Sequence, residues 1–145
     1  MAITNILTAS FIALVIALFV PIPVKGDLFG SDCGNNKTHN FKFGDRGFFD
    51  KLLYSSYVKA EGSWLRKISK DVTYPPTGKQ PIGYITYMEA LDQYNDGNGG
   101  CAFLKAGGVG QNMVTFHIKS QRSQGFNFKI NIYGLDNACV AKLGN

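Results

Sequence analysis

The stretch FNFKINIY at residues 126–133 decides the fold class. Its apolar side chains recur at every second position, and asparagine, lysine and tyrosine occupy the positions between and after them. In an extended strand, successive side chains point to opposite faces of the sheet. The stretch therefore predicts a β-strand with a polar outer face and with a core face made of Phe126, Phe128, Ile130 and Ile132.

The same period of two appears in the neighbouring segments. Val114, Phe116 and Ile118 alternate with polar residues, and residues 84–89 are apolar on both faces, which is typical of a central strand. A further core face is expected for Trp64, Ile68, Val72 and Tyr74. Shorter strands are expected from Phe41 onward, at Leu52 to Val58 and at Ala102 to Ala106.

Turn-forming residues separate these strands. Runs rich in glycine, asparagine and serine lie at residues 95–100, 107–110 and 120–125, where they are typical of hairpin connections. We therefore predict an all-β fold of six to seven strands, arranged as a single antiparallel β-sandwich or a small barrel. The uneven strand lengths favour the sandwich.

Length and composition are consistent with one folded domain. The chain has 145 residues, of which 45% are hydrophobic and 17% are charged, so intrinsic disorder is excluded for most of the length. The formal net charge is +5, but the basic residues are spread along the chain. Because they are not clustered, the sequence does not favour direct binding of nucleic acid.

The N-terminal segment resembles a secretory signal peptide. An apolar run from Ile6 to Val20 ends at Pro21 and is too short to span a membrane comfortably. Small residues follow it, and we predict cleavage between Gly26 and Asp27. The expected organisation is a helical signal peptide at residues 1–26 and a single all-β domain at 27–145, secreted to the extracellular space without stable membrane insertion after cleavage. A retained membrane anchor is the alternative.

An exported protein can form disulfide bonds. Three cysteines lie beyond the cleavage site, so at least one is unpaired, capped or bonded to another chain. In a meander of the last three strands, Cys101 and Cys139 lie at opposite ends. Since domain termini are often close together, we predict a bond between Cys33 and Cys139 and a free thiol at Cys101. The unpaired cysteine could link two chains into an oligomer.

The residues from Ser31 to Asn40 form a polar leader before the first strand, and this leader carries a modification motif. Asn36-Lys37-Thr38 is an acceptor sequence for N-glycosylation. Asn36 is therefore a glycosylation candidate, and an unmodified loop asparagine is an equally supported alternative.

A family resemblance is carried by an ordered set of residues between Phe41 and Gly134. Its most regular parts are Ala90-Leu91-Asp92-Gln93, Gly97-Asn98-Gly99, Gly107-Gly108, Lys119-Ser120-Gln121-Arg122 and Ile132-Tyr133-Gly134, with Gly44, Arg46, Asp50 and Leu52 upstream. This set resembles a family of small insect secreted proteins, which includes salivary secreted peptides, response-to-pathogen (REPAT) proteins of gut epithelium, and the coactivator multiprotein bridging factor two. The resemblance implies secretion and a role in epithelial or immune responses. The polar residues that the resemblance marks as characteristic are Asp92, Gln93, Ser120, Gln121 and Arg122.

The inventory of catalytic residues is small. His39 lies in the polar leader and His117 on the outer face of a strand, and neither has a sequence-local nucleophile arrangement. The run after Asp92 lacks the acidic twelfth position of a calcium loop, and the glycines at 107–110 join two strands rather than opening a helix. We therefore expect no enzyme activity, no metal and no cofactor.

Two functions from different classes remain. The first is a secreted binding or effector protein whose basic, tyrosine-rich surface meets a protein, a glycan or a microbial surface. The second is an intracellular coactivator that bridges a DNA-bound regulator and the basal transcription machinery. The apolar N-terminal run favours the first. Carriage of an apolar ligand inside a barrel is a third possibility.

Overall fold

The computed structural model describes residues 33–143. The predicted signal peptide and its cleavage site between Gly26 and Asp27 lie outside these residues. Seven strands and one short helix follow each other along the chain: β1 (Phe41–Gly44), β2 (Lys51–Ala60), β3 (Ser69–Tyr74), β4 (Gly83–Asp92), β5 (Cys101–Gly107), β6 (Val114–Lys119), β7 (Phe126–Asp136) and α2 (Asn137–Leu143).

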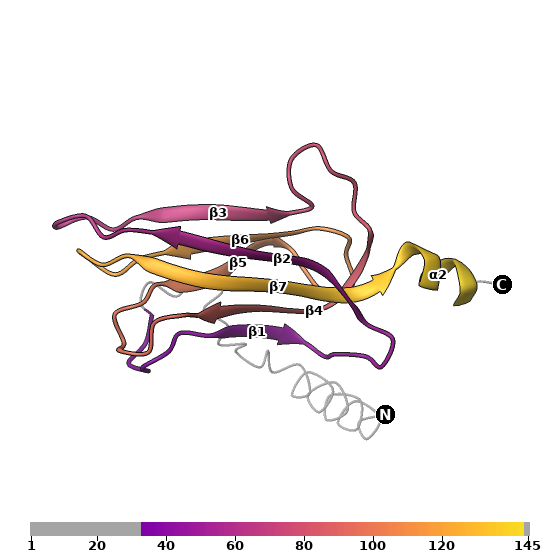
Figure 1. Cartoon of the computed structure of the whole chain (residues 1–145), viewed down its shortest axis with the longest axis horizontal. Helices are drawn as coiled ribbons and strands as arrows, with labels where there is room; N and C mark the ends of the chain where they lie inside the picture. The colour runs from indigo at the N-terminus through magenta and orange to yellow at the C-terminus, as the bar shows by residue number, and fades with distance from the viewer. Residues whose placement is uncertain (1–32, 144–145) are drawn as a thin grey trace, which may run out of the picture.

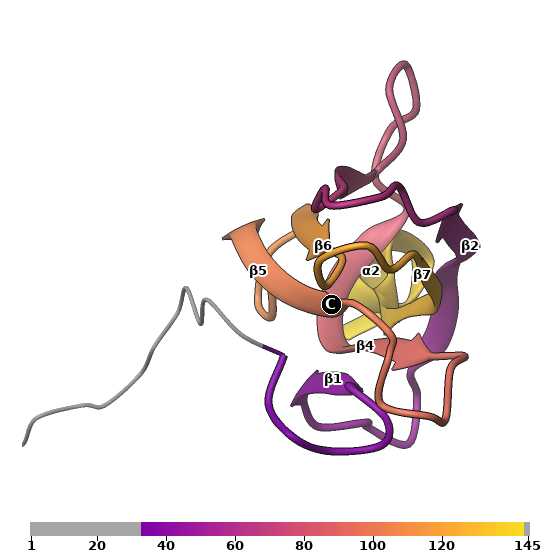
Figure 2. The same ribbon diagram turned by 90° about the vertical axis from the view of Figure 1, so that its left-hand side faces the viewer.

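The strands form two packed antiparallel sheets, which confirms the predicted all-β sandwich. The four-stranded sheet has the order β1-β4-β7-β2 and the three-stranded sheet has the order β3-β6-β5. The long strand β7 runs through the middle of the larger sheet, and α2 continues from its end (Figure 1). Seen along the strands, the two sheets curve around a common interior (Figure 2).

The core contains the residues that the alternating pattern selects. Phe126, Phe128, Ile130 and Ile132 on β7 are at most 1% exposed, and they face Val114, Phe116 and Ile118 of the other sheet, which are fully buried. Burying one such side chain contributes about 1.5 to 3 kcal/mol. The predicted central position of residues 84–89 is also confirmed, because β4 is paired with β1 on one side and β7 on the other.

One local prediction was wrong, and one element was not predicted. Trp64 is 84% exposed, whereas Tyr74 is buried and Ile68 and Val72 are half-buried. Trp64 precedes β3 in a turn in which Leu65 has a φ of 58°, so the extended period does not reach back to it. The helix α2 was not expected, and Asp136 caps it by accepting a hydrogen bond from the Cys139 amide at 2.7 Å.

The sandwich has two distinct ends. At the glycine end, β1, β3, β5 and β7 finish and β2, β4 and β6 begin. The turn after β5 docks there on β4, because Gly110 donates to the Ile85 carbonyl and the Ile85 amide donates to Gln111, both at 2.8 Å. At the opposite end, β5 and β7 begin and the chain from Cys33 enters β1; we call this the disulfide end.

Candidate functional site

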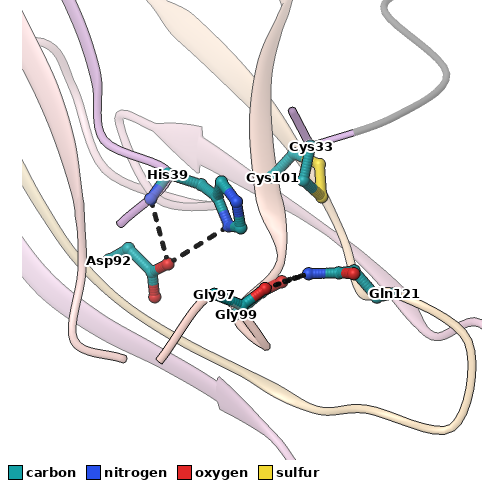
Figure 3. The surroundings of a disulfide bond; sticks show 7 residues. All are labelled: Cys33, His39, Asp92, Gly97, Gly99, Cys101 and Gln121. Carbon is teal, nitrogen blue, oxygen red and sulfur yellow. Dashed lines mark hydrogen bonds and ion pairs between the residues drawn. A yellow bond between two sulfur atoms is a disulfide. The ribbon is translucent and has the colours of Figure 1, made fainter. Parts of the chain in front are cut away.

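The segment before β1, residues 33–40, is fastened to the disulfide end and is called the strap. Cys33 is disulfide-bonded to Cys101 at the start of β5, with their Cα atoms 5.1 Å apart (Figure 3). The predicted bond between Cys33 and Cys139 is therefore wrong, and so is the free thiol at Cys101. The free cysteine among the described residues is Cys139, half-buried in α2.

The error has a simple geometric cause. The expected separation of Cys101 and Cys139 was right, since β7 runs the length of the sandwich between the two ends and α2 follows it (Figure 1). However, Phe41 pairs with Ala90 near the end of β4, so the strap enters at the disulfide end. Cys33 thus meets Cys101, and the two termini of the described chain are not neighbours.

Asp92 is the anchor of the strap. Its buried carboxylate accepts hydrogen bonds from the His39 amide at 3.2 Å and from the Tyr94 amide at 3.0 Å. Its own amide donates to the side chain of Asn40 at 2.8 Å, and His39 Nδ1 lies 3.5 Å from the same carboxylate (Figure 3). His39, which lies in the polar leader of the sequence, is therefore buried, because the strap folds it against β4.

Gln121 and Ser120 fasten two further loops. The Gln121 side-chain amide donates to the carbonyls of Gly97 and Gly99 at 2.7 and 2.9 Å, which holds the loop between β4 and β5 (Figure 3). Ser120 is buried and exchanges two 2.8 Å hydrogen bonds with the Ile68 backbone. Gln93 is exposed, and its side chain donates to the Leu91 carbonyl at 2.9 Å.

Beside the disulfide lies a hollow of about 400 Å³, which we call the cationic hollow. Three basic residues contribute to its wall: Lys67 from the turn before β3, Lys119 from the end of β6 and Arg122 from the turn before β7. The rest of the lining is Cys33, Gly34, Asn35, Cys101, Ser120 and Gln121. None of these lining residues is acidic, so the hollow carries a concentrated positive potential.

Asp71, a carboxylate on the strand next to Lys119, is already engaged by other residues. In the β3–β6 register Asp71 lies opposite His117, and Ser69 lies opposite Lys119. Asp71 accepts from Lys105 Nζ at 2.5 Å and lies 2.7 Å from His117 Nδ1. Hydrogen bonds from Lys105 and then His117 lower the pKa of the Asp71 carboxyl. Asp71 is therefore a partner of these two residues rather than of the hollow.

A second, smaller hollow of about 210 Å³ also borders the disulfide, and its lining includes Asn36 and His39. Asn36 itself is exposed, so the glycosylation candidate is accessible. Within residues 33–143, His, Cys, Asp and Glu side chains form no group of three that could hold a metal ion. No helix in this part of the chain is long and apolar enough to cross a membrane.

Comparison with known proteins places this architecture in a family. The family model described as "Transcription activator MBF2" matches residues 43–134, which is more than half of the chain. The chain belongs to the MBF2 family. It is also 39% identical over 98 residues to a "Probable salivary secreted peptide" of Bombus ignitus, a match that covers 68% of this chain and 71% of the relative. No solved structure matches the chain significantly.

The range matched by the MBF2 family model contains most of the residues described above, but not all of them. Asp92, Ser120, Gln121, Arg122 and Cys101 lie inside the matched range, and Cys33 lies before it. Lys119 and Arg122 belong to the family pattern, but their convergence with Lys67 depends on contact between the β2–β3 and β6–β7 connections. The pairing of Cys101 with Lys119 places Cys101 at the disulfide end, but only the pairing of Phe41 with Ala90 brings the strap to the same end.

Proposed function

We propose that this chain is a secreted, non-enzymatic binding protein that meets its extracellular partner at the disulfide end. The observation that carries the proposal is the cationic hollow, which has a disulfide wall, three basic residues and no acidic residue in its lining. Such a hollow attracts and orients an anionic surface, and none of its residues forms a nucleophile and base pair.

Secretion is supported by three observations. Disulfide bonds persist in oxidising compartments and are rare in the cytosol and nucleus, and the bond between Cys33 and Cys101 joins two distant segments of one chain. The similar protein from Bombus ignitus carries the word "secreted" in its name. The apolar run at the N-terminus is the third observation, since it resembles the signal peptide that directs a protein to secretion.

The surroundings of the two histidines support a non-catalytic role. The ring of His39 is packed against Asp92 in the interior, and that of His117 is paired with Asp71 beside Lys105. Neither ring reaches a serine or cysteine as a hydrogen-bond partner in the described structure. Binding is therefore the function that these residues support best.

Expression of the full chain in insect cells tests the proposal. We expect a secreted product that begins at Asp27 and that shows a peptide linked through Cys33 and Cys101 under non-reducing conditions. The secreted protein is then used to capture partners from gut fluid or saliva. A partner held by the wild type should be lost in Lys67→Glu/Arg122→Glu and retained in the charge-matched control Lys42→Glu/Lys79→Glu. Equal loss in both variants, or a cell-retained product beginning at Met1, would contradict the proposal.

A bridging coactivator is the second candidate, and the description of the matching family model as a transcription activator favours it. Cell fractionation separates the two candidates. An uncleaved, reduced protein in the nucleus supports the coactivator, whereas a shortened, disulfide-bonded protein in the medium supports the extracellular binding protein.

A further inference from the structure

We propose that the cationic hollow is a binding site for a sulfate or phosphate ester carried by the extracellular partner. This inference rests on the proposed function and names the chemical group that the disulfide end recognises.

The three cations have complementary geometry. Arg122 offers a planar fork of N–H donors, which suits two oxygens of a tetrahedral anion, whereas Lys67 and Lys119 act as point charges. Lys119 lies between β3 and β5 in the register, opposite Ser69 on one side and Cys101 on the other. Lys119 is half-buried, whereas Lys67 and Arg122 are exposed, and all three line the hollow.

Neighbouring carboxylates already have partners within the described chain. Asp71 is bonded to Lys105 and lies against His117. The carboxylate of Asp92 accepts two backbone amides, and that of Asp96 accepts the amide and the side chain of Asn98 at 2.9 and 3.1 Å. An incoming anion therefore displaces none of these acids from Lys67, Lys119 or Arg122.

The segments that carry the cations are tied together. The turn before β3 and the turn before β7 exchange hydrogen bonds, since the Leu65 amide donates to Ser123 Oγ and the Ser123 amide donates to the Arg66 carbonyl, both at 2.9 Å. The paired bonds of Ser120 and Ile68 add to this connection. Lys67 and Arg122 thus lie on turns that are linked to each other, so the backbone that carries them needs little reordering on binding.

The remaining wall is equally constrained. The disulfide fixes Cys33 on Cys101, and Gln121 uses its side-chain amide to hold the loop at Gly97 and Gly99. A volume of about 400 Å³ lies within the range of small-molecule sites. The hollow can therefore admit the ester together with part of the group that carries it.

The test measures binding of small oxyanion probes to the secreted, disulfide-bonded protein by calorimetry or NMR titration. The probes are inorganic sulfate, inorganic phosphate, glucose 6-sulfate and glucose 6-phosphate, with unmodified glucose as the neutral reference. We expect the esters to bind and glucose not to bind, with chemical-shift changes centred on Lys119 and Arg122. The sugar ester with the lower dissociation constant shows whether the partner carries a sulfate or a phosphate ester.

The matched variants are Lys119→Gln/Arg122→Gln and Lys42→Gln/Lys79→Gln, which have the same net charge. Loss of two charge-assisted contacts should raise the dissociation constant about tenfold or more in the first variant, and the second should stay within about twofold of the wild type. Equal weakening in both variants, or no binding of any oxyanion, would overturn the inference. If the partner captured from gut fluid still requires the hollow while no oxyanion binds, this inference fails and the proposed function stands.

Discussion

The two ends of the sandwich are built by different physical means. At the disulfide end, a covalent bond and polar side chains hold segments that have no strand partner: Cys33 is bonded to Cys101, and Asp92 and Gln121 bind backbone groups. At the glycine end, segments are instead held together by the close packing of their backbones. Gly44 has a φ of 87°, and a Cβ at this position would lie 2.7 Å from Val109 and would also clash with the Thr86 carbonyl.

This difference explains why one family pattern contains both glycines and polar residues. The glycines of the pattern lie where a Cβ would come within 3 Å of another atom or where φ is positive. Most of the polar residues bind backbone groups that need a partner. Arg122 is an exception, since it is exposed and lines the cationic hollow. A functional role is therefore expected at the disulfide end, where charged side chains remain available, rather than at the glycine end.

The largest expected effect concerns the covalent bond. Replacing both Cys33 and Cys101 by serine releases two residues separated by 68 positions, which lowers the free energy of unfolding by up to about 4 kcal/mol in the chain-entropy view. Urea denaturation under identical conditions measures the change. Cys139→Ser is the control and should cost less than about 1 kcal/mol. A control as destabilised as the double variant would contradict the assignment of the bond.

Removing the buried anchor of the strap comes next. Asp92→Ala leaves the His39 and Tyr94 amides without their acceptor, and we expect a loss of about 3 kcal/mol. Asp96→Ala is the matched change in an exposed loop, where the carboxylate bonds only to Asn98, and it should cost less than about 1 kcal/mol. Thermal unfolding of both variants checks the ranking, and similar midpoints would show that the strap is not anchored through Asp92.

The glycine end is tested by separating steric contact from backbone strain. Gly44→Ala combines a positive φ with contacts to Val109 and Thr86, and should cost about 2 to 3 kcal/mol. Gly34→Ala, in the strap, has a similar φ of 74° but no neighbour within 4 Å, so it should cost only about 1 kcal/mol. Denaturant titrations of the two variants give the comparison. Equal costs would mean that close packing contributes nothing at the glycine end.

The smallest effect is the pH dependence of the exposed network beside the cationic hollow. The pKa of Asp71 is lowered by its hydrogen bonds to Lys105 and His117, so the unfolded chain takes up the proton first as the pH falls. The stabilisation is present above the ordinary aspartate pKa and is lost as the pH falls through the lower folded value. Asp71→Asn should therefore differ slightly from the wild type near neutral pH and converge with it in acid, and added salt should shrink the difference. A difference that grows in acid would reverse the assigned sign.

The fold class could be predicted from the sequence because it depends on a local alternation of apolar and polar side chains. Side chains at 126–133 and at 114–118 alternate with the period of a strand, and the structure buries the apolar members in one core. Seven strands match the expected number, and the exposed Trp64 differs because a single residue with positive φ interrupts the period. The family was likewise readable, since its pattern is an ordered spacing along one chain.

The candidate site depended on long-range contacts that no local pattern encodes. His39 is polar and precedes the first strand, yet it is buried because the strap crosses β4 at Asp92, 53 positions away. Lys67, Lys119 and Arg122 were visible as separate charges, but strand register and paired turns bring them to one hollow. The sequence by itself determined which faces are apolar, because burial follows side-chain chemistry at a fixed period. Only the tertiary structure decided that Cys33 meets Cys101, because that choice depends on which end of the sandwich the chain enters.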